Sequence, residues 1–405
     1  MYGAGRSKPL RKIKMKFSEQ QTKYFFNIYM QMASGKLDHS NVKGCIWLSS
    51  TEMQRVVGDD YKEVMSCFFT VVDENYRPPT AHTKGICKAY KATDAFHSFI
   101  DKVIKEKPEV ISTRKLVKGV KYFFEQINIA ALEGIISKGL DFCKNREDLM
   151  TARIMRLACD DNGTNAVSYR RTAGEKGRRF ATSVSLQTLP KYIRFAVINN
   201  VTDIDMVNCH PVLIKAFLNK AYENIQTDAI DTYIDDRERA LQEIMLFYTV
   251  DRAAAKQLVL MVGYGASLDN ISGAFGDWIS ENKAKITIVN NKMINSAFMI
   301  AFQSEMRDAK KAILQLPEAG SFNGPNGNRA FSLFIQSVED EILQLIEGWM
   351  SWRERTVVTL MFDGIMIEGE VSGEEIKNLE KNISRWLWKK YDIECEMKLS
   401  IKYFQ

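Results

Sequence analysis

The sequence predicts an α+β fold, and three observations lead to that prediction. Strand-like stretches that end near residue 207 resume near residue 356, and a long block of helical pattern separates them. The chain then closes with a strand–turn–strand, a helix and a further strand. Strands that are interrupted by a helical insertion indicate segregated helices and strands. The 405 residues, 45% hydrophobic and 26% charged, are enough for one large core or two modest ones.

The first part of the chain predicts short elements of mixed type. Residues 17–105 combine aromatic-rich helical stretches such as KYFFNIYMQM with strand-like pieces such as GCIWLSS. Residues 1–18 form a basic arm whose Lys and Arg charges sum to the +6 of the whole chain. Such an arm suits phosphate backbones, and it equally suits a solvated tail. From 113 to 158 apolar residues recur at spacings of three and four, which predicts helices.

The remaining elements follow from the same periodicities. A glycine- and arginine-rich loop (RRTAGEKGRR) is expected at 170–179. Alternation of apolar and polar residues predicts strands, and the three-and-four spacing predicts helices. In order, we expect strands in YIRFAVI and VTDIDMV, helix from about 236 to 262, a loop at 318–328, helix at about 330–350, a hairpin in TVVTLMFDGIMIEG, helix at 373–391 and a strand in IECEMKLSI.

Several classes of protein are excluded by composition. No apolar run approaches the roughly 18–20 residues that a membrane-spanning helix needs. The basic N-terminal residues are not followed by the apolar core of a secretory signal. The seven cysteines are dispersed and lack the spacing of a zinc site, which is typical of free thiols in a reducing compartment. We therefore expect an intracellular protein that is not secreted and has no membrane partner.

Carboxylates at the ends of two strand-like segments are the first candidates for chemistry. In VTDIDMVNCHP, Asp203 and Asp205 are two residues apart and so share one face of a strand. Asp363 precedes a glycine between two apolar runs, which predicts a tight hairpin turn. An Asp at a hairpin tip can also hold a metal ligand in the open. Magnesium is commonly bound by one or two carboxylates together with substrate phosphates.

The segment DRAAAKQLVLMVGYG is the second candidate. Its residues Arg252, Lys256, Leu260 and Tyr264 are spaced by four and therefore share one face of a helix. Two cations followed by an apolar residue and an aromatic ring suit a nucleoside triphosphate that lies along the helix. The alternative interpretation is an ordinary amphipathic helix with basic ends.

These segments, in this order, resemble motifs A, B and C of the family A DNA polymerases and the related single-subunit phage RNA polymerases. Motif B of that family reads Arg, three residues, Lys, seven residues, Tyr-Gly, and RAAAKQLVLMVGYG matches it. GRRFATSVSLQTLP resembles the family's Gly-Arg-Leu…Asn-Leu-Gln-Asn-Ile-Pro element, and NRAFSLFIQSVEDEIL resembles its late helix. The resemblance spans the C-terminal two-thirds of the chain. It looks closest to the divergent polymerases of viruses, virophages and transposons.

The resemblance implies a template-directed nucleotidyl transferase, a DNA polymerase that serves a viral or mobile-element genome. It also implies a right-hand polymerase fold with an antiparallel palm sheet and helical fingers. Because residues 1–150 are too few for the family's proofreading domain and lack an Asp-x-Glu pair, we expect no 3′–5′ exonuclease activity. The expected divisions are an N-terminal domain of unknown role at 1–112, thumb-like helices at 113–165, palm at 166–217 and 331–405, and fingers at 218–330.

The resemblance also implies roles for single residues. Asp205 and Asp363 would hold two Mg²⁺ ions, or Mn²⁺ in their place, with the backbone carbonyl of Met206 on one ion. Asp203 is the alternative to Asp205, and Asn208 would then replace His210 as the residue facing the sugar. Lys256 would act as general acid and would bind the triphosphate with Arg252. The remaining implied contacts are Leu260, Tyr264 and His210 with the nucleotide, and Arg178, Gln187 and Gln336 with the template–primer duplex.

Three departures from the family's pattern leave the choice of sugar open. His210 stands where the family has Glu, Leu260 stands where it has Phe or Tyr, and Gly364 follows Asp363 where Glu is common. A primase-polymerase or RNA polymerase that uses ribonucleotides is therefore the first alternative. A catalytically inactive nucleic-acid-binding replication factor is an alternative of another class. The expected partners are a DNA template and primer, nucleoside triphosphates and, as an alternative, RNA, bound by a monomer in the cytoplasm or nucleus of a host.

Overall fold

The computed structural model describes residues 17–33, 45–73, 88–106, 116–222, 227–289, 292–322 and 326–405. The chain forms two compact units. The first is built from Met1–Lys121, Glu125–Ala166 and Ser183–Val197, and the second from Tyr122–Phe124, Val167–Thr182 and Ile198–Gln405. Residues 1–16 of the basic arm lie outside the described residues. The division into thumb, palm and fingers stays a prediction.

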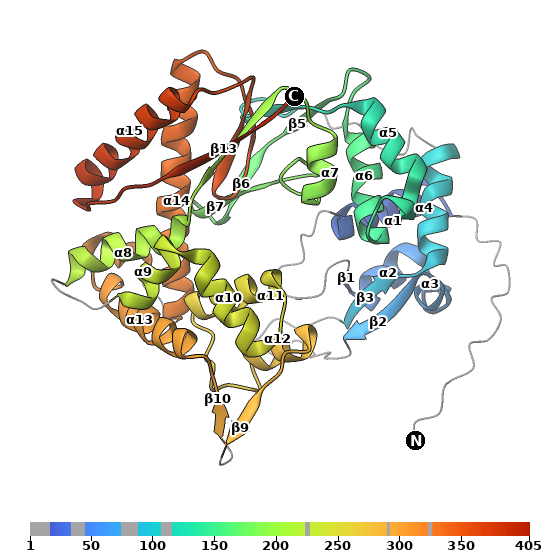
Figure 1. The fold of residues 1–405 in the computed structure, drawn as a ribbon. Helices are drawn as coiled ribbons and strands as arrows, with labels where there is room; N and C mark the ends of the chain where they lie inside the picture. The colour runs from blue at the N-terminus through green and yellow to red at the C-terminus, as the bar shows by residue number, and fades with distance from the viewer. Residues whose placement is uncertain are drawn as a thin grey trace. The chain divides into compact units, whose positions relative to one another are not determined.

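The first unit combines helices with a small antiparallel sheet of order β1-β3-β2 (Figure 1). The sheet consists of β1 (Cys45–Leu48), β2 (Phe69–Asp73) and β3 (Lys88–Ala92). Packed aromatic rings form its core, with Phe25 and Phe68 in edge contact at 5.3 Å and Phe68 and Phe96 at 5.4 Å. Its helices are α1 (Glu19–Ala33), α2 (Ser50–Val57), α3 (Tyr61–Phe68), α4 (Asp94–Glu106), α5 (Ile129–Lys138), α6 (Arg146–Ala158) and α7 (Lys191–Ala196).

Two sequence predictions in this region were wrong. The stretch YIRFAVI lies largely in α7, because the Pro190 carbonyl accepts hydrogen bonds from Ile193 N (3.0 Å) and Arg194 N (2.9 Å) and so starts a helical turn. The predicted helix from residue 113 is interrupted by β4 (Phe123–Gln126), whose side chains alternate between buried and exposed. β4 pairs with β5 (Thr164–Val167), so strand pairing overrides the helical spacing there.

The second unit contains a four-stranded antiparallel sheet of order β11-β12-β8-β13. Its strands are β8 (Val201–Met206), β11 (Val357–Leu360), β12 (Gly364–Glu368) and β13 (Leu399–Phe404). The strands predicted in VTDIDMV and on both sides of Asp363 are confirmed. A bond from Met361 N to Gly364 O (2.9 Å) closes the hairpin turn around Phe362 and Asp363. The sheet therefore joins segments from both sides of the helical block.

Helices make up most of the rest of this unit. The block predicted at 236–262 is broken at Thr249, whose left-handed φ of 54° ends one helix before the next begins. The helix predicted at 373–391 is confirmed and starts with a capping box between Ser372 and Glu375. The helices are α8 (Cys209–Ala221), α9 (Asp228–Asp235), α10 (Arg237–Tyr248), α11 (Arg252–Gly263), α12 (Ala274–Asn282), α13 (Ala297–Ile313), α14 (Gly327–Trp352) and α15 (Gly373–Tyr391).

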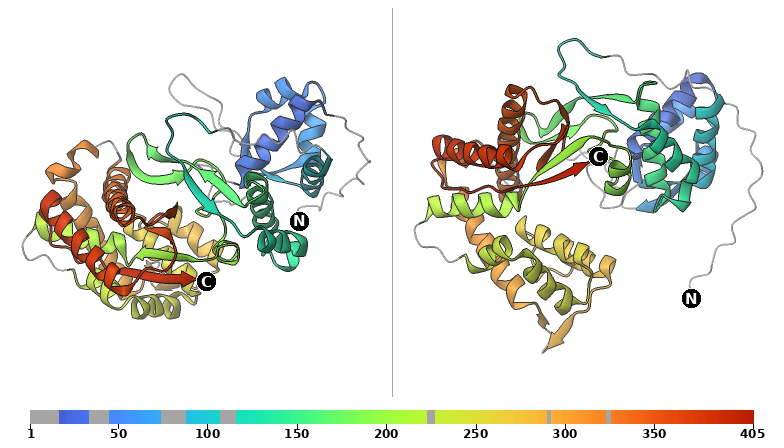
Figure 2. Two further views of the ribbon diagram at one scale, coloured as in Figure 1. Left: turned by 90° about the horizontal axis from the view of Figure 1, so that it is seen from above. Right: turned by 45° about the horizontal axis from the view of Figure 1, so that its top comes forward.

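Two hairpins complete the second unit. The first is formed by β6 (Tyr169–Ala173) and β7 (Lys176–Ala181), and β7 lies against α14. The second is formed by β9 (Thr287–Val289) and β10 (Lys292–Ile294) and projects from the helices (Figure 2). The coarse prediction of segregated helices and strands is confirmed, whereas the right-hand arrangement stays a prediction. Among the described residues, none of the helices has the length and apolar character to cross a membrane.

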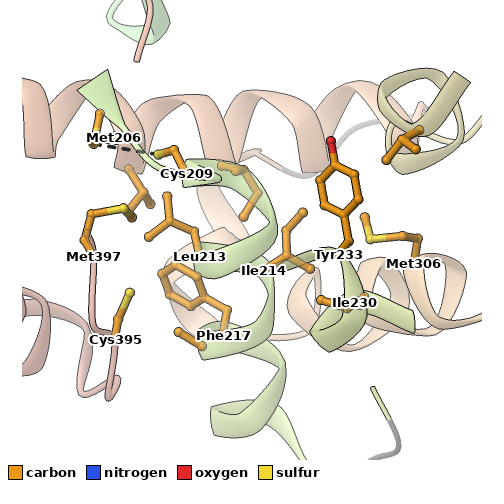
Figure 3. Close-up of a cluster of buried hydrophobic side chains, with 14 of the residues drawn as sticks. Met206, Cys209, Leu213, Ile214, Phe217, Ile230, Tyr233, Met306, Cys395 and Met397 are labelled. Carbon is orange, nitrogen blue, oxygen red and sulfur yellow. Dashed lines mark hydrogen bonds between the residues drawn. The ribbon is translucent and has the colours of Figure 1, made fainter. Parts of the chain in front are cut away.

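A large apolar core fixes the end of β8 against the helices. Met206 and Cys209 are buried, and their sulfur atoms lie 3.8 Å apart (Figure 3). Leu213 and Phe217 extend the same face of α8 and are fully buried, beside Met397 from the segment before β13 (Figure 3). Burial of such side chains contributes roughly 1.5–3 kcal/mol each. This packing holds rigid the strand end that carries Asp205.

Candidate functional site

Asp205 and Asp363 lie side by side although they are far apart in the sequence. Asp205 is opposite Gly364 in the pairing of β8 with β12. Met206 N donates a hydrogen bond to the backbone carbonyl of Asp363 (2.8 Å), which ties the hairpin turn to the end of β8. The two carboxyl groups are close enough for the charge of Asp363 to raise the pKa of Asp205.

Gly364 makes this close approach possible. A Cβ atom at this position would lie 2.5 Å from the Ile204 carbonyl oxygen and 3.1 Å from Oδ1 of Asp205. The first distance is shorter than any normal contact, and the atom approached belongs to the backbone. Gly364 therefore lets β12 lie directly against β8, where the two aspartates meet.

The environment of Asp205 favours its protonated form. Loss of hydration raises the pKa of its carboxyl to about 7, and the negative charges of Asp363 and Asp203 act in the same direction. Part of the side chain is still open to solvent. The positive charge of Lys256 opposes the shift. A bound cation would relieve the repulsion between these solvent-accessible carboxylates. Asp203 adds charge, and Asp205 is the residue paired with Gly364 beside the hairpin turn.

Lys256 is the cation that α11 brings to this pair. Loss of hydration lowers the pKa of its ammonium group, and the positive charge of Arg237 lowers it further. The charges of Asp363 and Asp205 act in the opposite direction, which places all three groups within electrostatic range. Sequence reasoning missed Arg237, at the start of α10. Its Nη1 donates to Oδ1 of Asn208 (3.1 Å), and no motif in the surrounding DDRER signals it.

The other residues of α11 differ in their surroundings. Arg252 is exposed and bonded to Glu238 on α10, with Nε 2.9 Å from Oε2. That bond raises the pKa of Arg252. Leu260 is 44% exposed although it is apolar. Tyr264 follows the helix as its C-cap and turns inward. The side chains predicted to face a nucleotide therefore begin at a surface ion pair and end at the partly buried ring of Tyr264.

Tyr264 belongs to a network that sequence reasoning missed. Its hydroxyl is hydrogen-bonded to Nδ1 of His210, and the two rings meet edge to face at 5.7 Å. Nε2 of His210 lies 3.0 Å from Oε1 of Glu339 on α14. Glu339 has 0% exposure and is also bound by Arg178, with Nη2 2.7 Å from Oε1. Burial is the largest cause that raises the pKa of Tyr264, so its hydroxyl keeps its proton.

The residues predicted to contact a duplex are divided between the two units. Arg178 is paired with Glu339, and its guanidinium also lies 5.7 Å from the centre of the Phe362 ring. Gln336 on α14 donates to Ser332 Oγ (2.9 Å). Gln187 belongs to the first unit and is buried there. In that unit the adjacent Leu186 N donates to both oxygens of the buried Glu125 (2.9 and 3.0 Å).

The donor set suits magnesium better than zinc. Within the part of the chain that the structure describes, no three or more His, Cys, Asp or Glu side chains gather as a metal site. A structural zinc would need such a set. Magnesium instead needs one or two carboxylates and takes its remaining oxygens from water and substrate phosphates. Asp205 and Asp363 meet that requirement, and the Met206 carbonyl is the next backbone oxygen along β8.

The chain was compared with known proteins in three ways. No family model matches the sequence. A Sputnik virophage protein named as a candidate helicase, V13, is 30% identical over 202 residues, which are 49% of this chain and 24% of that protein. This chain thus spans about a quarter of its relative. Among solved structures, the chain is similar to the POL domain of Pol1 from M. smegmatis, solved in complex with DNA primer-template and dNTP. That similarity covers 95% of this chain and 65% of the other, with 14% identity and a TM-score of 0.42.

Proposed function

We propose that this chain is a template-directed nucleotidyl transferase, and specifically a DNA polymerase. The observation that carries the proposal is the meeting of Asp205 and Asp363 at the junction of β8 and β12, with Lys256 in electrostatic range. The order of the sequence motifs alone points to the same three residues. Three unrelated surface residues would not be expected to converge in this way.

The carboxylate pair is the proposed binding site for two divalent cations. Two carboxylates about 4 Å apart repel each other by roughly 4 kcal/mol at an effective dielectric of 20. The carboxylate oxygens of Asp205 and Asp363 would coordinate the cations, so that attraction to the cations replaces this repulsion. The Met206 carbonyl would add a neutral oxygen ligand. Bound Mg²⁺ would lower the pKa of a primer 3′-hydroxyl and neutralise charge during in-line phosphoryl transfer.

Lys256 is the proposed proton donor to the departing pyrophosphate. A general acid works best when its pKa lies close to the working pH, and the surroundings of Lys256 shift its pKa downward in that direction. Its charge also attracts the triphosphate. Arg252 would exchange Glu238 for a phosphate, and the neighbouring Arg237 would add a third positive charge. Tyr264, Leu260 and His210 would then face the base and sugar.

We further propose that the enzyme serves the replication of a viral or mobile-element genome. The support is the 30% identity to a virophage protein over half of this chain. The helicase name belongs to that longer protein, of which this chain spans 24%. A replication protein with a polymerase region and a helicase region would account both for the proposed polymerase site in this chain and for the helicase name of the longer relative.

A primer-extension assay tests the proposed function. The assay supplies a primed DNA template, Mg²⁺ and either dNTPs or NTPs, and compares the wild type with Asp363→Asn. We expect extension by dNTPs that needs Mg²⁺ and falls by at least 10³-fold in Asp363→Asn. Glu368→Gln is the matched control, because Glu368 is an exposed acid at the far end of the same strand.

Other results of the primer-extension assay would indicate a different function. Extension by NTPs alone, or initiation without a primer, would identify an RNA polymerase or primase. Salt-sensitive DNA binding without incorporation of either nucleotide would identify an inactive replication factor. Incorporation that survives in Asp363→Asn at the rate of Glu368→Gln would contradict the proposed site.

A further inference from the structure

Glu339 is a buried carboxylate with a defined set of partners. It lies in the middle of α14 with 0% exposure. Arg178 binds it through Nε and Nη2, and His210 Nε2 lies 3.0 Å from its Oε1. These partners outweigh the effect of burial, so the pKa of Glu339 is lowered and the side chain is charged at neutral pH. A charged group in this position is costly unless every partner is in place.

Nε2 of His210 faces two groups, Oε1 of Glu339 at 3.0 Å and Nη2 of Arg178 at 3.2 Å. Glu339 can only accept a hydrogen bond and Arg178 can only donate one, so Glu339 favours a proton on Nε2. In that tautomer Nδ1 accepts from the Tyr264 hydroxyl. A carboxylate behind an imidazole orients the ring in the same way at metal sites. The order of contacts is Glu339, His210, Tyr264.

We propose that Glu339 is a positioning residue that acts through His210 to orient Tyr264 at the nucleotide site. This inference rests on the proposed function, which places Tyr264 beside the incoming nucleotide. His210 has both ring nitrogens engaged and is 7% exposed, so its ring has little freedom to turn. Tyr264 is consequently held by its hydroxyl as well as by the end of α11. Nucleotide binding then needs less ordering of the ring, which favours affinity.

Asp340 is the natural control for Glu339. It is the next residue of α14, is 2% exposed, and binds Arg171 (Nη2–Oδ2 2.6 Å) and Arg179 (Nε–Oδ1 2.6 Å). It therefore matches Glu339 in burial, in charge and in pairing with the same arginine-rich hairpin. No hydrogen bond or ion pair connects the described Asp340 side chain to His210. A purely structural role for Glu339 predicts equal effects of Glu339→Gln and Asp340→Asn.

The test is a double-mutant cycle on the full chain with steady-state single-nucleotide incorporation. The variants are Glu339→Gln, Tyr264→Phe, both together, and Asp340→Asn. We expect Glu339→Gln to raise the KM for the nucleotide roughly tenfold while kcat changes much less. In the Tyr264→Phe background, which lacks the hydroxyl, the same substitution should raise KM little further. Asp340→Asn should leave the nucleotide KM near the wild-type value.

Three results would overturn the inference. The first is an equal rise in nucleotide KM for Glu339→Gln and Asp340→Asn. The second is a Glu339→Gln effect that persists in full without the Tyr264 hydroxyl. A change confined to primer–template affinity would also contradict it, because that would show Glu339 acting through Arg178. A wild type that neither binds nor incorporates nucleotides would instead overturn the proposed function, and with it the role of Glu339.

A measurement on the wild type covers the case in which Glu339→Gln does not fold. Nitrogen-15 NMR of the histidine rings reports which nitrogen is protonated, and the His210 signals are assigned with His210→Gln. We expect the proton of His210 on Nε2, where it faces Glu339. A ring protonated on Nδ1 alone would show that Nε2 accepts from Arg178, and it would contradict the proposed role of Glu339. The same spectrum with Tyr264→Phe should show a shift at Nδ1.

Discussion

Asp205 and Glu339 are two carboxylates of one unit in opposite electrostatic environments. Acids surround Asp205, and its pKa is raised to about 7, first by loss of hydration and then by the charges of Asp363 and Asp203. Arg178 and His210 surround Glu339, and its pKa is lowered although it is buried. The first carboxylate needs cations from outside the chain, whereas the second has the guanidinium of Arg178 as a cation within the chain. This contrast separates the proposed metal site from its supporting structure.

The Asp205→Asn substitution should stabilise the metal-free protein at neutral pH. The raised pKa means that the folded state binds a proton more tightly than the unfolded state, so wild-type stability falls as pH rises from about 4 to about 7. Asparagine does not titrate and avoids that loss. We expect a gain of the order of 1 kcal/mol at pH 8, because solvent screens the partly exposed side chain.

Urea unfolding of both proteins between pH 5 and pH 8 measures this gain. Addition of Mg²⁺ should stabilise the wild type and reduce the difference, because only the wild type retains both carboxylates. A gain that is constant with pH, or one that Mg²⁺ does not change, would contradict the account of Asp205.

Glu339 should give a pH dependence of opposite sign. Its lowered pKa contributes stability that is present above pH 4.5 and is lost as pH falls below the ordinary value of a glutamate. The stability difference between the wild type and Glu339→Gln should therefore shrink on acidification below pH 4.5. Denaturant unfolding at pH 3.5, 4.5 and 6 measures it. A difference that grows on acidification would show that Glu339 is protonated in the folded state.

At the scale of elements, the site depends on how closely β12 approaches β8. Gly364→Ala should force the strands apart, since the added Cβ would lie 2.5 Å from the Ile204 carbonyl. We expect a loss of about 1–3 kcal/mol in unfolding free energy and a larger proportional loss of nucleotide incorporation. Gly373→Ala is a suitable control, because a Cβ there meets nothing within 4 Å. Equal stabilities for the two variants would mean that the strands can separate at no cost.

Ion pairs between the β6–β7 hairpin and α14 form a second such junction. Arg179 binds Asp340 and Glu347, with Nη1 2.9 Å from Oε2 of the latter. Arg179→Met should cost about 3–5 kcal/mol, because it leaves buried carboxylates short of a cation. Arg239→Met, at an exposed position of α10, should change stability by less than about 0.5 kcal/mol. Thermal or urea unfolding compares the stabilities of the two variants. A small effect of Arg179→Met would indicate that Asp340 and Glu347 are in contact with water.

The local sequence predicted some of these elements and missed others. Asp-Gly between apolar runs and the three-and-four spacing at 373–391 are local signals, so the sequence predicted the hairpin and this helix. YIRFAVI was assigned to a strand because alternation over seven residues does not reveal the turn that Pro190 starts. The charged side chains of α14 gave no local sign of their partners. The complementary pairs Arg178-Arg179 and Glu339-Asp340 were the available signal, but only tertiary contact shows that they meet.

At the scale of the whole molecule, the sequence motifs identified Asp205 and Asp363 as candidate site residues, and the structure shows which residues surround them. Motif order predicted that Asp205, Lys256 and Asp363 belong together, because each motif carries a distinct part of one chemistry. It could not choose between Asp203 and Asp205, since both lie on one face of β8. The pairing of Gly364 with Asp205 places Asp205 at the hairpin turn. Arg237 and Glu339 were missed because their roles depend on long-range contacts alone.

Binding of Mn²⁺, followed by electron paramagnetic resonance, tests most directly whether two distant aspartates share one cation site. The measurement uses the full chain with a chain-terminated primer–template and a dNTP. We predict that the wild type, Asp203→Asn and Glu368→Gln bind Mn²⁺ with similar affinity, whereas Asp205→Asn and Asp363→Asn each lose at least tenfold. Equal binding by Asp205→Asn, Asp363→Asn and the wild type would contradict the account.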